Sequence, residues 1–160
     1  MASALRPGSF ELCGALTDGA ISWVCPGVYL RDIALPAMEK GAQSAGRNTP
    51  PLIAHVPVCV HENRQDLLEA AKEQLGHYVR QPFYVEMFKE AGFPEAESNE
   101  WSERMIDAVV FSGTEGQVQE RIQQLFSWGA TEIIATVIAA GSSPASSRQR
   151  TLDLIQGMSS

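Results

Sequence analysis

Residues 4–23, ALRPGSFELCGALTDGAISW, constrain the fold more than any other part of the sequence. They read as the end of a strand at residues 2–5, a Pro7-Gly8 turn, a short helix capped by Ser9, an Asp18-Gly19 stop and a second strand over residues 20–24. The first amide groups of a helix lack partners within that helix, and its dipole favours negative charge there. The segment therefore predicts a strand–helix–strand unit whose first loop can hold a phosphate.

The rest of the chain continues this alternation of strands and helices. Strands are predicted over 52–60 and 132–138, and helices over 29–45, 63–78, 81–92, 101–110, 114–129 and 145–156. Pro36 is expected to kink its helix, and Pro57 to mark a bulge or a local edge of its strand. Four strands separated by helices indicate an α/β fold with parallel strands and right-handed crossovers. Such strands form either a small open sheet or half of an eight-stranded barrel.

Composition narrows the classes of function. The 160 residues are 44% hydrophobic and 19% charged, as in a single globular domain over residues 1–160. A net charge of -7 argues against a nucleic-acid partner, and no apolar run is long enough to cross a membrane. The three cysteines lack the spacing of a zinc site or a disulfide framework, and no histidine pair has metal-ligand spacing. We expect a cytoplasmic protein with no metal.

Two stretches carry a resemblance to a known family. The first is ALRPGSFELCGALTDGAISW with the helix and the strand VPVCV that follow, and the second is VVFSGTEGQVQERIQQLFSWGATEIIATV. Together they resemble the luciferase-like monooxygenase superfamily, most closely its deazaflavin-dependent members. The resemblance implies the fold of a (β/α)8, or TIM, barrel, of which this chain would supply the C-terminal half without the N-terminal strands. It also implies an oxidoreductase that uses FMN or a deazaflavin coenzyme.

The family binds the flavin phosphate at the loop that corresponds to Leu5, Arg6, Pro7, Gly8 and Ser9. Gly8 permits close approach of the backbone, whereas Pro7 has no N–H to donate. The amides of Gly8, Ser9 and Phe10 are therefore the expected donors, and Arg6 can add positive charge. An ordinary strand-to-helix turn remains the alternative.

Other candidate residues follow the strands that lead to the expected barrel mouth. By the resemblance, Trp23 is a cofactor-binding candidate, and His61 and Tyr84 are candidates for a substrate pocket; the alternative for each is packing. His55 is expected to be an ordinary buried histidine. Cys25, beside Pro26, is expected to be more exposed than the other cysteines, which leaves a catalytic thiol open.

Three functions remain possible on this basis. The first is the C-terminal half of a flavin- or deazaflavin-dependent oxidoreductase that acts on a small organic substrate. The second is a non-catalytic half-barrel that acts by assembly, because open sheet edges recruit further strands and favour a homodimer. The third is a small α/β domain that binds a phosphorylated ligand.

Overall fold

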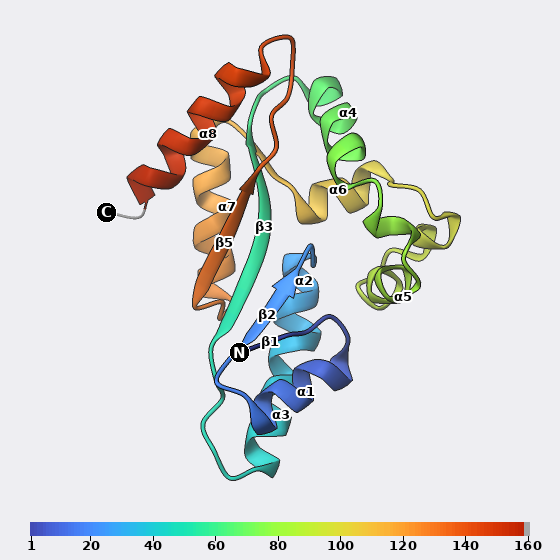
Figure 1. Cartoon of the computed structure of the whole chain (residues 1–160), viewed down its shortest axis with the longest axis vertical. Helices are drawn as coiled ribbons and strands as arrows, with labels where there is room; N and C mark the ends of the chain where they lie inside the picture. Colours follow the sequence, from blue (N-terminus) through green and yellow to red (C-terminus); the bar gives the residue numbers. More distant parts are fainter. Residues whose placement is uncertain (159–160) are drawn as a thin grey trace.

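The computed structural model describes residues 1–158, and it contains a parallel sheet with helices packed against one face (Figure 1). The expected domain over 1–160 includes Ser159 and Ser160, which lie outside the described residues. The strands are β1 (Ala2–Ser3), β2 (Ala20–Trp23), β3 (Leu52–Val60), β4 (Phe111–Gly113) and β5 (Glu132–Val137). The α-helices are α1 (Pro7–Leu16), α2 (Gly27–Tyr29), α3 (Leu35–Ser44), α4 (Arg64–Leu75), α5 (Pro82–Glu90), α6 (Glu103–Val109), α7 (Glu115–Ser127) and α8 (Pro144–Met158).

The strand β3 is the centre of the sheet. It pairs in parallel with β2 over its first half, with β4 at its end, and with β5 along the opposite edge. All nine residues of β3 are buried, as is typical of a central parallel strand. The predicted parallel α/β architecture is therefore confirmed, but the sequence prediction missed the short strand β4.

Pro57 lies where β3 changes partners. On the edge that β2 and β4 share, β2 pairs as far as His55 and β4 begins at Val58, so neither strand is registered opposite Pro57. The N–H and C=O of odd-numbered β3 residues face this edge, because the carbonyls of the even-numbered Leu52 and Val58 accept from the amides of Thr131 and Ile138 on the β5 side. The missing N–H of Pro57 therefore costs no ladder hydrogen bond. The local edge predicted at this proline is confirmed.

The predicted helix over residues 29–45 is broken into three pieces. Between α2 and α3 lies a π-helical turn, η1 (Leu30–Ala34), which ends just before Pro36. A proline inside a helix removes one backbone donor and crowds the preceding turn, and the wider turn accommodates both effects. The kink expected at Pro36 is thus realised as this turn.

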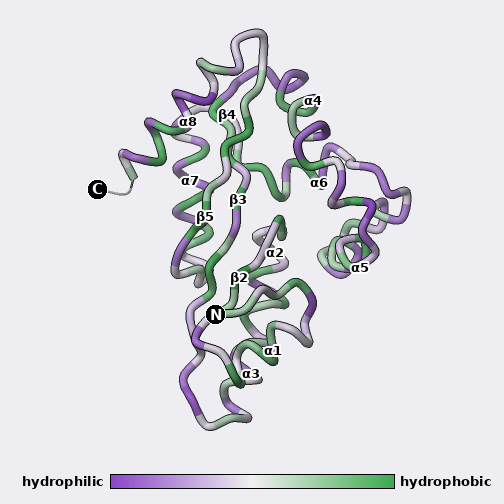
Figure 2. Tube along the Cα trace, in the orientation of Figure 1, coloured by the Kyte–Doolittle hydropathy of each residue, from purple (hydrophilic) through white to green (hydrophobic). Residues whose placement is uncertain are grey.

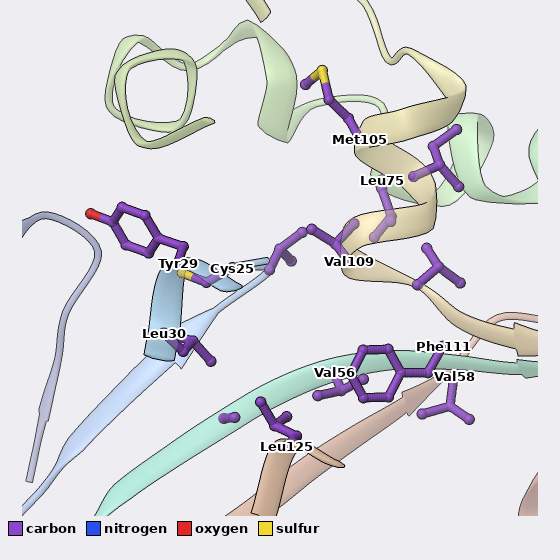
Figure 3. Packing of buried hydrophobic residues seen from close by; sticks show 14 of the residues in the cluster. Cys25, Tyr29, Leu30, Val56, Val58, Leu75, Met105, Val109, Phe111 and Leu125 are labelled. Carbon is purple, nitrogen blue, oxygen red and sulfur yellow. The ribbon is translucent and has the colours of Figure 1, made fainter. Parts of the chain in front are cut away.

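The buried core lies between the sheet and its helices. The buried cluster includes Tyr29, Leu30 and Leu125 from the helical segments and Val56 and Val58 of β3, all of which are labelled in Figure 3. In Figure 2, α4 alternates between hydrophilic and hydrophobic residues, as expected of a helix with one buried side. Asn63 caps α4 by accepting from the amides of Gln65 and Asp66, and Thr114 with Gln117 forms the predicted capping box of α7.

The two faces of the sheet are covered differently. On the helix-covered face, Ala20, Leu52, Ala54 and Val58 are at most 1% exposed. The other face carries Ile21 and Trp23, which are half-buried, and Ile134, which is 37% exposed. No helix lies in front of β3 and β5 on this face in Figure 1. We call it the open face; in a closed barrel it would line the interior.

Candidate functional site

The loop between β1 and α1 is closed by the side chain of Ser9. Its hydroxyl accepts from the amides of Leu5 and Arg6, both at 3.1 Å, and donates to the carbonyl of Arg6 at 2.7 Å. These bonds fix the loop and also commit the Ser9 hydroxyl to the backbone. The predicted phosphate loop is therefore ordered by its own hydrogen bonds.

The backbone amides at the start of α1 differ in whether they already have a hydrogen-bond partner. The amides of Ser9 and Phe10 donate to the carbonyl of Arg6, at 3.0 and 3.1 Å. The amide of Gly8 has no partner among residues 1–158, and a methyl group built on Gly8 would meet no atom within 4 Å. Of the three donors expected from the sequence, Gly8 is the one that faces open space without a bond.

Arg6 is held by an acidic residue from a distant segment. Its Nη2 lies 2.6 Å from the Oε1 of Glu90, the last residue of α5. The Tyr29 hydroxyl lies 3.0 Å from the carbonyl oxygen of Leu5 and 3.3 Å from Oε2 of Glu90. Burial, and then the charge of Glu90, raise the pKa of Tyr29, so it stays a neutral donor. An anion at this loop would meet Arg6 with Glu90 beside it.

A pocket of about 500 Å³ opens beside this loop. Its lining includes Leu5, Arg6 and Ser9 from the loop and Phe83 and Tyr84 from α5. The structure thus brings Tyr84, a candidate for the substrate pocket, next to the candidates for phosphate binding. We call this space the loop pocket.

Trp23 ends β2 and connects the loop pocket to the open face. The Tyr84 hydroxyl donates to the Trp23 carbonyl at 3.1 Å, and the Trp23 indole N–H donates to the Tyr78 hydroxyl at 2.7 Å. The indole stacks on the imidazole of His55, with ring centroids 3.6 Å apart and planes 7° from parallel. The rings of Tyr78 and Tyr84 lie 5.0 Å apart.

His55 is 3% exposed and uses both ring nitrogens. Its Nδ1 accepts from the amide of Val24 at 3.3 Å, so Nε2 carries the proton and donates to Oγ1 of Thr136 at 3.0 Å. Burial lowers the pKa of His55 to about 4, which keeps it neutral. Val24 has a φ of 51°, which is rare for a β-branched residue, and ends β2 one residue earlier than predicted.

Trp23, His55, Tyr78 and Thr136 line a second pocket of about 210 Å³, on the open face. We call it the inner pocket. The sequence prediction placed His55 correctly as a buried group but gave no sign of this pocket. His55 and Thr136 are far apart in the chain and meet only through the pairing of β3 with β5.

Two other candidates are placed away from these pockets. His61 follows β3, and its Nε2 lies 2.9 Å from Oδ2 of Asp66, while Gly141 packs against its ring. It lines neither the loop pocket nor the inner pocket. Cys25 is the most exposed of the three cysteines, as expected, but it is still buried at 7% exposure, and burial raises its pKa to about 12, which argues against a catalytic thiol.

Comparison with known proteins identifies the family. The family model described as luciferase-like monooxygenase matches residues 1–132. The chain belongs to this family. The resemblance seen in the sequence is therefore confirmed, although no curated protein matches at a significant level.

Solved structures of luciferase-like enzymes share this fold. An F420-dependent secondary alcohol dehydrogenase in complex with an F420–acetone adduct has a TM-score of 0.68 at 15% identity, over 96% of this chain and 47% of its own. The coenzyme F420 dependent tetrahydromethanopterin reductase of Methanopyrus kandleri has a TM-score of 0.61 at 21% identity, over 84% and 43%. The oxygenating constituent of 3,6-diketocamphane monooxygenase of Pseudomonas putida, in complex with FMN, has a TM-score of 0.55 at 15% identity, over 96% and 45%.

The chain spans about half the length of these three luciferase-like structures, so its sheet corresponds to part of a barrel. Residues 1–158 contain no helix that is both long enough and apolar enough to cross a bilayer. The same residues hold no group of three or more acidic, histidine or cysteine side chains suited to a metal ion.

Proposed function

We propose that this chain binds the phosphate end of a flavin or deazaflavin at the loop Leu5, Arg6, Pro7, Gly8 and Ser9, as the C-terminal half of a luciferase-like oxidoreductase. The observation that carries the proposal is the loop pocket, in which three of these residues face Tyr84. Two findings support it: the chain belongs to the luciferase-like family, and similar solved structures contain an F420 adduct or FMN.

The lining residues of the loop pocket, together with Gly8 next to Ser9 in the chain, fit such a group. The unpartnered Gly8 amide lies at the positive end of α1, where an anion is favoured. Arg6 is one-third exposed and keeps a positive charge next to the pocket. Phe83 and Tyr84 add aromatic surface for a flat ring system. The pocket volume, about 500 Å³, lies within the range of roughly 300–1,000 Å³ typical of cofactor sites.

In this proposal the bound cofactor supplies the hydride or oxygen chemistry. The chain itself holds and orients it: Gly8 donates to the phosphate, Arg6 balances its charge, and Glu90 with Tyr29 fixes Arg6. Trp23, tied to Tyr84 and Tyr78, forms the wall behind the ring, and His61 remains a weaker candidate for substrate contact. The substrate would be a small organic molecule.

The test is a titration of the purified chain with FMN and, separately, with coenzyme F420, followed by cofactor fluorescence. The informative variant is Gly8→Ala, because its methyl group enters open space and leaves folding intact. Blocking close approach to the phosphate should weaken binding by at least about fivefold, the equivalent of one hydrogen bond. Gly116→Ala is the matched control, since Gly116 is also the second residue of a helix and also faces open space.

Two results would contradict the proposal. One is that FMN and coenzyme F420 both fail to bind and both leave the midpoint of thermal unfolding of the chain unchanged. The other is that both cofactors bind and Gly8→Ala binds them as tightly as the unchanged chain, which would place the phosphate elsewhere.

The open face also favours a second function, homomeric assembly. Ile134 is 37% exposed on β5, whose outer edge has no paired strand among the described residues. An unpaired edge beside apolar side chains is a site of association. We expect a homodimer, and Ile134→Lys should convert it to a monomer in analytical ultracentrifugation. Leu16→Lys is the control, because Leu16 is 71% exposed at the end of α1 and is not part of β5. A monomer at all concentrations without substitution would remove this function.

A further inference from the structure

The inner pocket has a chemical character that the family does not determine. Its polar lining comprises His55, Gln74, Tyr78 and Thr136, and the remainder is aromatic or aliphatic. None of its lining residues is an acid, a lysine or an arginine. His55 is neutral because its Nδ1 accepts a hydrogen bond and burial lowers its pKa to about 4. A charged ligand would lose its hydration here without gaining an opposite charge.

Two hydroxyl protons are available inside the pocket. The Tyr78 oxygen accepts from the Trp23 indole, and the Thr136 oxygen accepts from His55. Among residues 1–158, no acceptor is found for either hydroxyl proton. Each proton is therefore free to bond to an oxygen atom of a ligand.

The walls of the inner pocket are joined by stacking and hydrogen bonds, and the pocket is adjacent to the proposed cofactor site. The stacked rings of Trp23 and His55 are fixed by bonds to Tyr78, Val24 and Thr136. Tyr78 lines the inner pocket and Tyr84 lines the loop pocket, and their rings lie 5.0 Å apart. A molecule in one pocket is thus separated from the other by this tyrosine pair and Trp23.

We propose that the inner pocket binds a small uncharged molecule with a carbonyl or hydroxyl oxygen. That oxygen accepts from Tyr78 and Thr136, and the apolar part of the molecule lies on the stacked rings of Trp23 and His55. The inference rests on the proposed function only in calling this molecule the substrate, because the contacts argued for it come from residues of this chain and need no cofactor. Its volume of about 210 Å³ limits the molecule to a size well below that of a flavin.

The experiment uses cyclohexanone as the probe and the Trp23 indole N–H as the reporter, in ¹⁵N-labelled chain without cofactor. The chain has three tryptophans, and the Trp23→Phe spectrum identifies the Trp23 signal. Cyclohexanone should shift this signal in a saturable way. Cyclohexanecarboxylate and cyclohexylammonium have the same ring with a charge, and should bind at least about tenfold more weakly because burial of an unpaired charge is costly.

Two substitutions test the contacts. Tyr78→Phe and Thr136→Val each remove one hydroxyl donor and should weaken cyclohexanone binding about fivefold. Thr131→Val is the control, because the Thr131 hydroxyl donates to the Leu52 carbonyl outside the pocket. The dispersion of the amide spectrum shows that each variant is folded.

The inference is overturned if cyclohexanone gives no saturable shift of the Trp23 signal, or if the charged analogues bind as well. It is also overturned if both Tyr78→Phe and Thr136→Val bind cyclohexanone like the unchanged chain. Failure of the cofactor titration with a positive result here would remove the proposed function and leave the pocket assignment standing.

Discussion

The two faces of the sheet are formed by the same strands but carry side chains of different chemical character. The helix-covered face is formed by small and aliphatic side chains, such as Ala54 and Val58, that are 0% exposed. The open face carries a polar and aromatic network in which Trp23, His55 and Thr136 are joined by stacking and hydrogen bonds. The first face is a hydrophobic core, and the second has the directional groups that a binding site needs.

The difference has a simple cause in parallel strands. Successive side chains point to opposite faces, and residues in register share a face, so Trp23, His55 and Ile134 must lie together. Crossover helices cover the outer face of each unit, while the inner face is covered only when a barrel closes. In a chain that spans about half of its structural relatives, the inner face is therefore the one left open.

The largest expected difference between the two faces is in the free energy of unfolding that is lost when a side chain is truncated to alanine. Leu52→Ala removes a side chain that is 1% exposed on the helix-covered face and should lower the free energy of unfolding by about 3 kcal/mol. Ile134→Ala, on the open face, should cost less than about 1 kcal/mol, because water already reaches this side chain. Urea denaturation of both variants at low protein concentration measures the contrast. Equal losses would mean that the open face is covered, and a loss at Ile134 that grows with protein concentration would identify a second copy as the cover.

The second prediction concerns acid and the open face. The pKa of His55 falls from 6.5 in the unfolded chain to about 4 in the folded one. The unfolded chain therefore binds more protons between these values, and stability is complete above pH 6.5 and decreases as the pH falls towards 4. The free energy of unfolding that the chain loses through His55 when the pH falls from 7 to 4 amounts to about 3 kcal/mol.

His55→Gln removes this titration, so its unfolding free energy should fall less between pH 7 and pH 4 than that of the unchanged chain. His77→Gln provides the control, because His77 is exposed and, although its ring packs on Tyr78, it is not a hydrogen-bond partner of His55. Urea denaturation over this pH range gives the slopes. Parallel slopes for the unchanged chain and His55→Gln would show that His55 is not held neutral by the fold.

Much of the fold was accessible from local sequence signals, but the arrangement of the site was not. The caps at Asn63 and Thr114, the broken helix at Pro36 and the edge at Pro57 each follow from the chemistry of one or two residues. The strand β4 was missed because its three residues have no period to detect. The partnership of Arg6 with Glu90 and of His55 with Thr136 depends on register and on the packing of distant segments, which a single sequence does not encode locally.

The smallest predicted effects come from two hydroxyls, one buried and one half-buried, and they differ in sign. Ser22 on the helix-covered face is 0% exposed, and its hydroxyl has no hydrogen-bond partner among residues 1–158. Ser22→Ala removes an unsatisfied polar group and should raise the free energy of unfolding by about 0.5–1 kcal/mol. Thr136→Val keeps the shape of its side chain but leaves the His55 Nε2–H without an acceptor, and should lower it by about 1 kcal/mol. Thermal and urea unfolding resolve changes of this size when both variants are measured together. If Ser22→Ala destabilised the chain as Thr136→Val does, the hydroxyl of Ser22 would have a partner, and the helix-covered face would carry a polar function as the open face does.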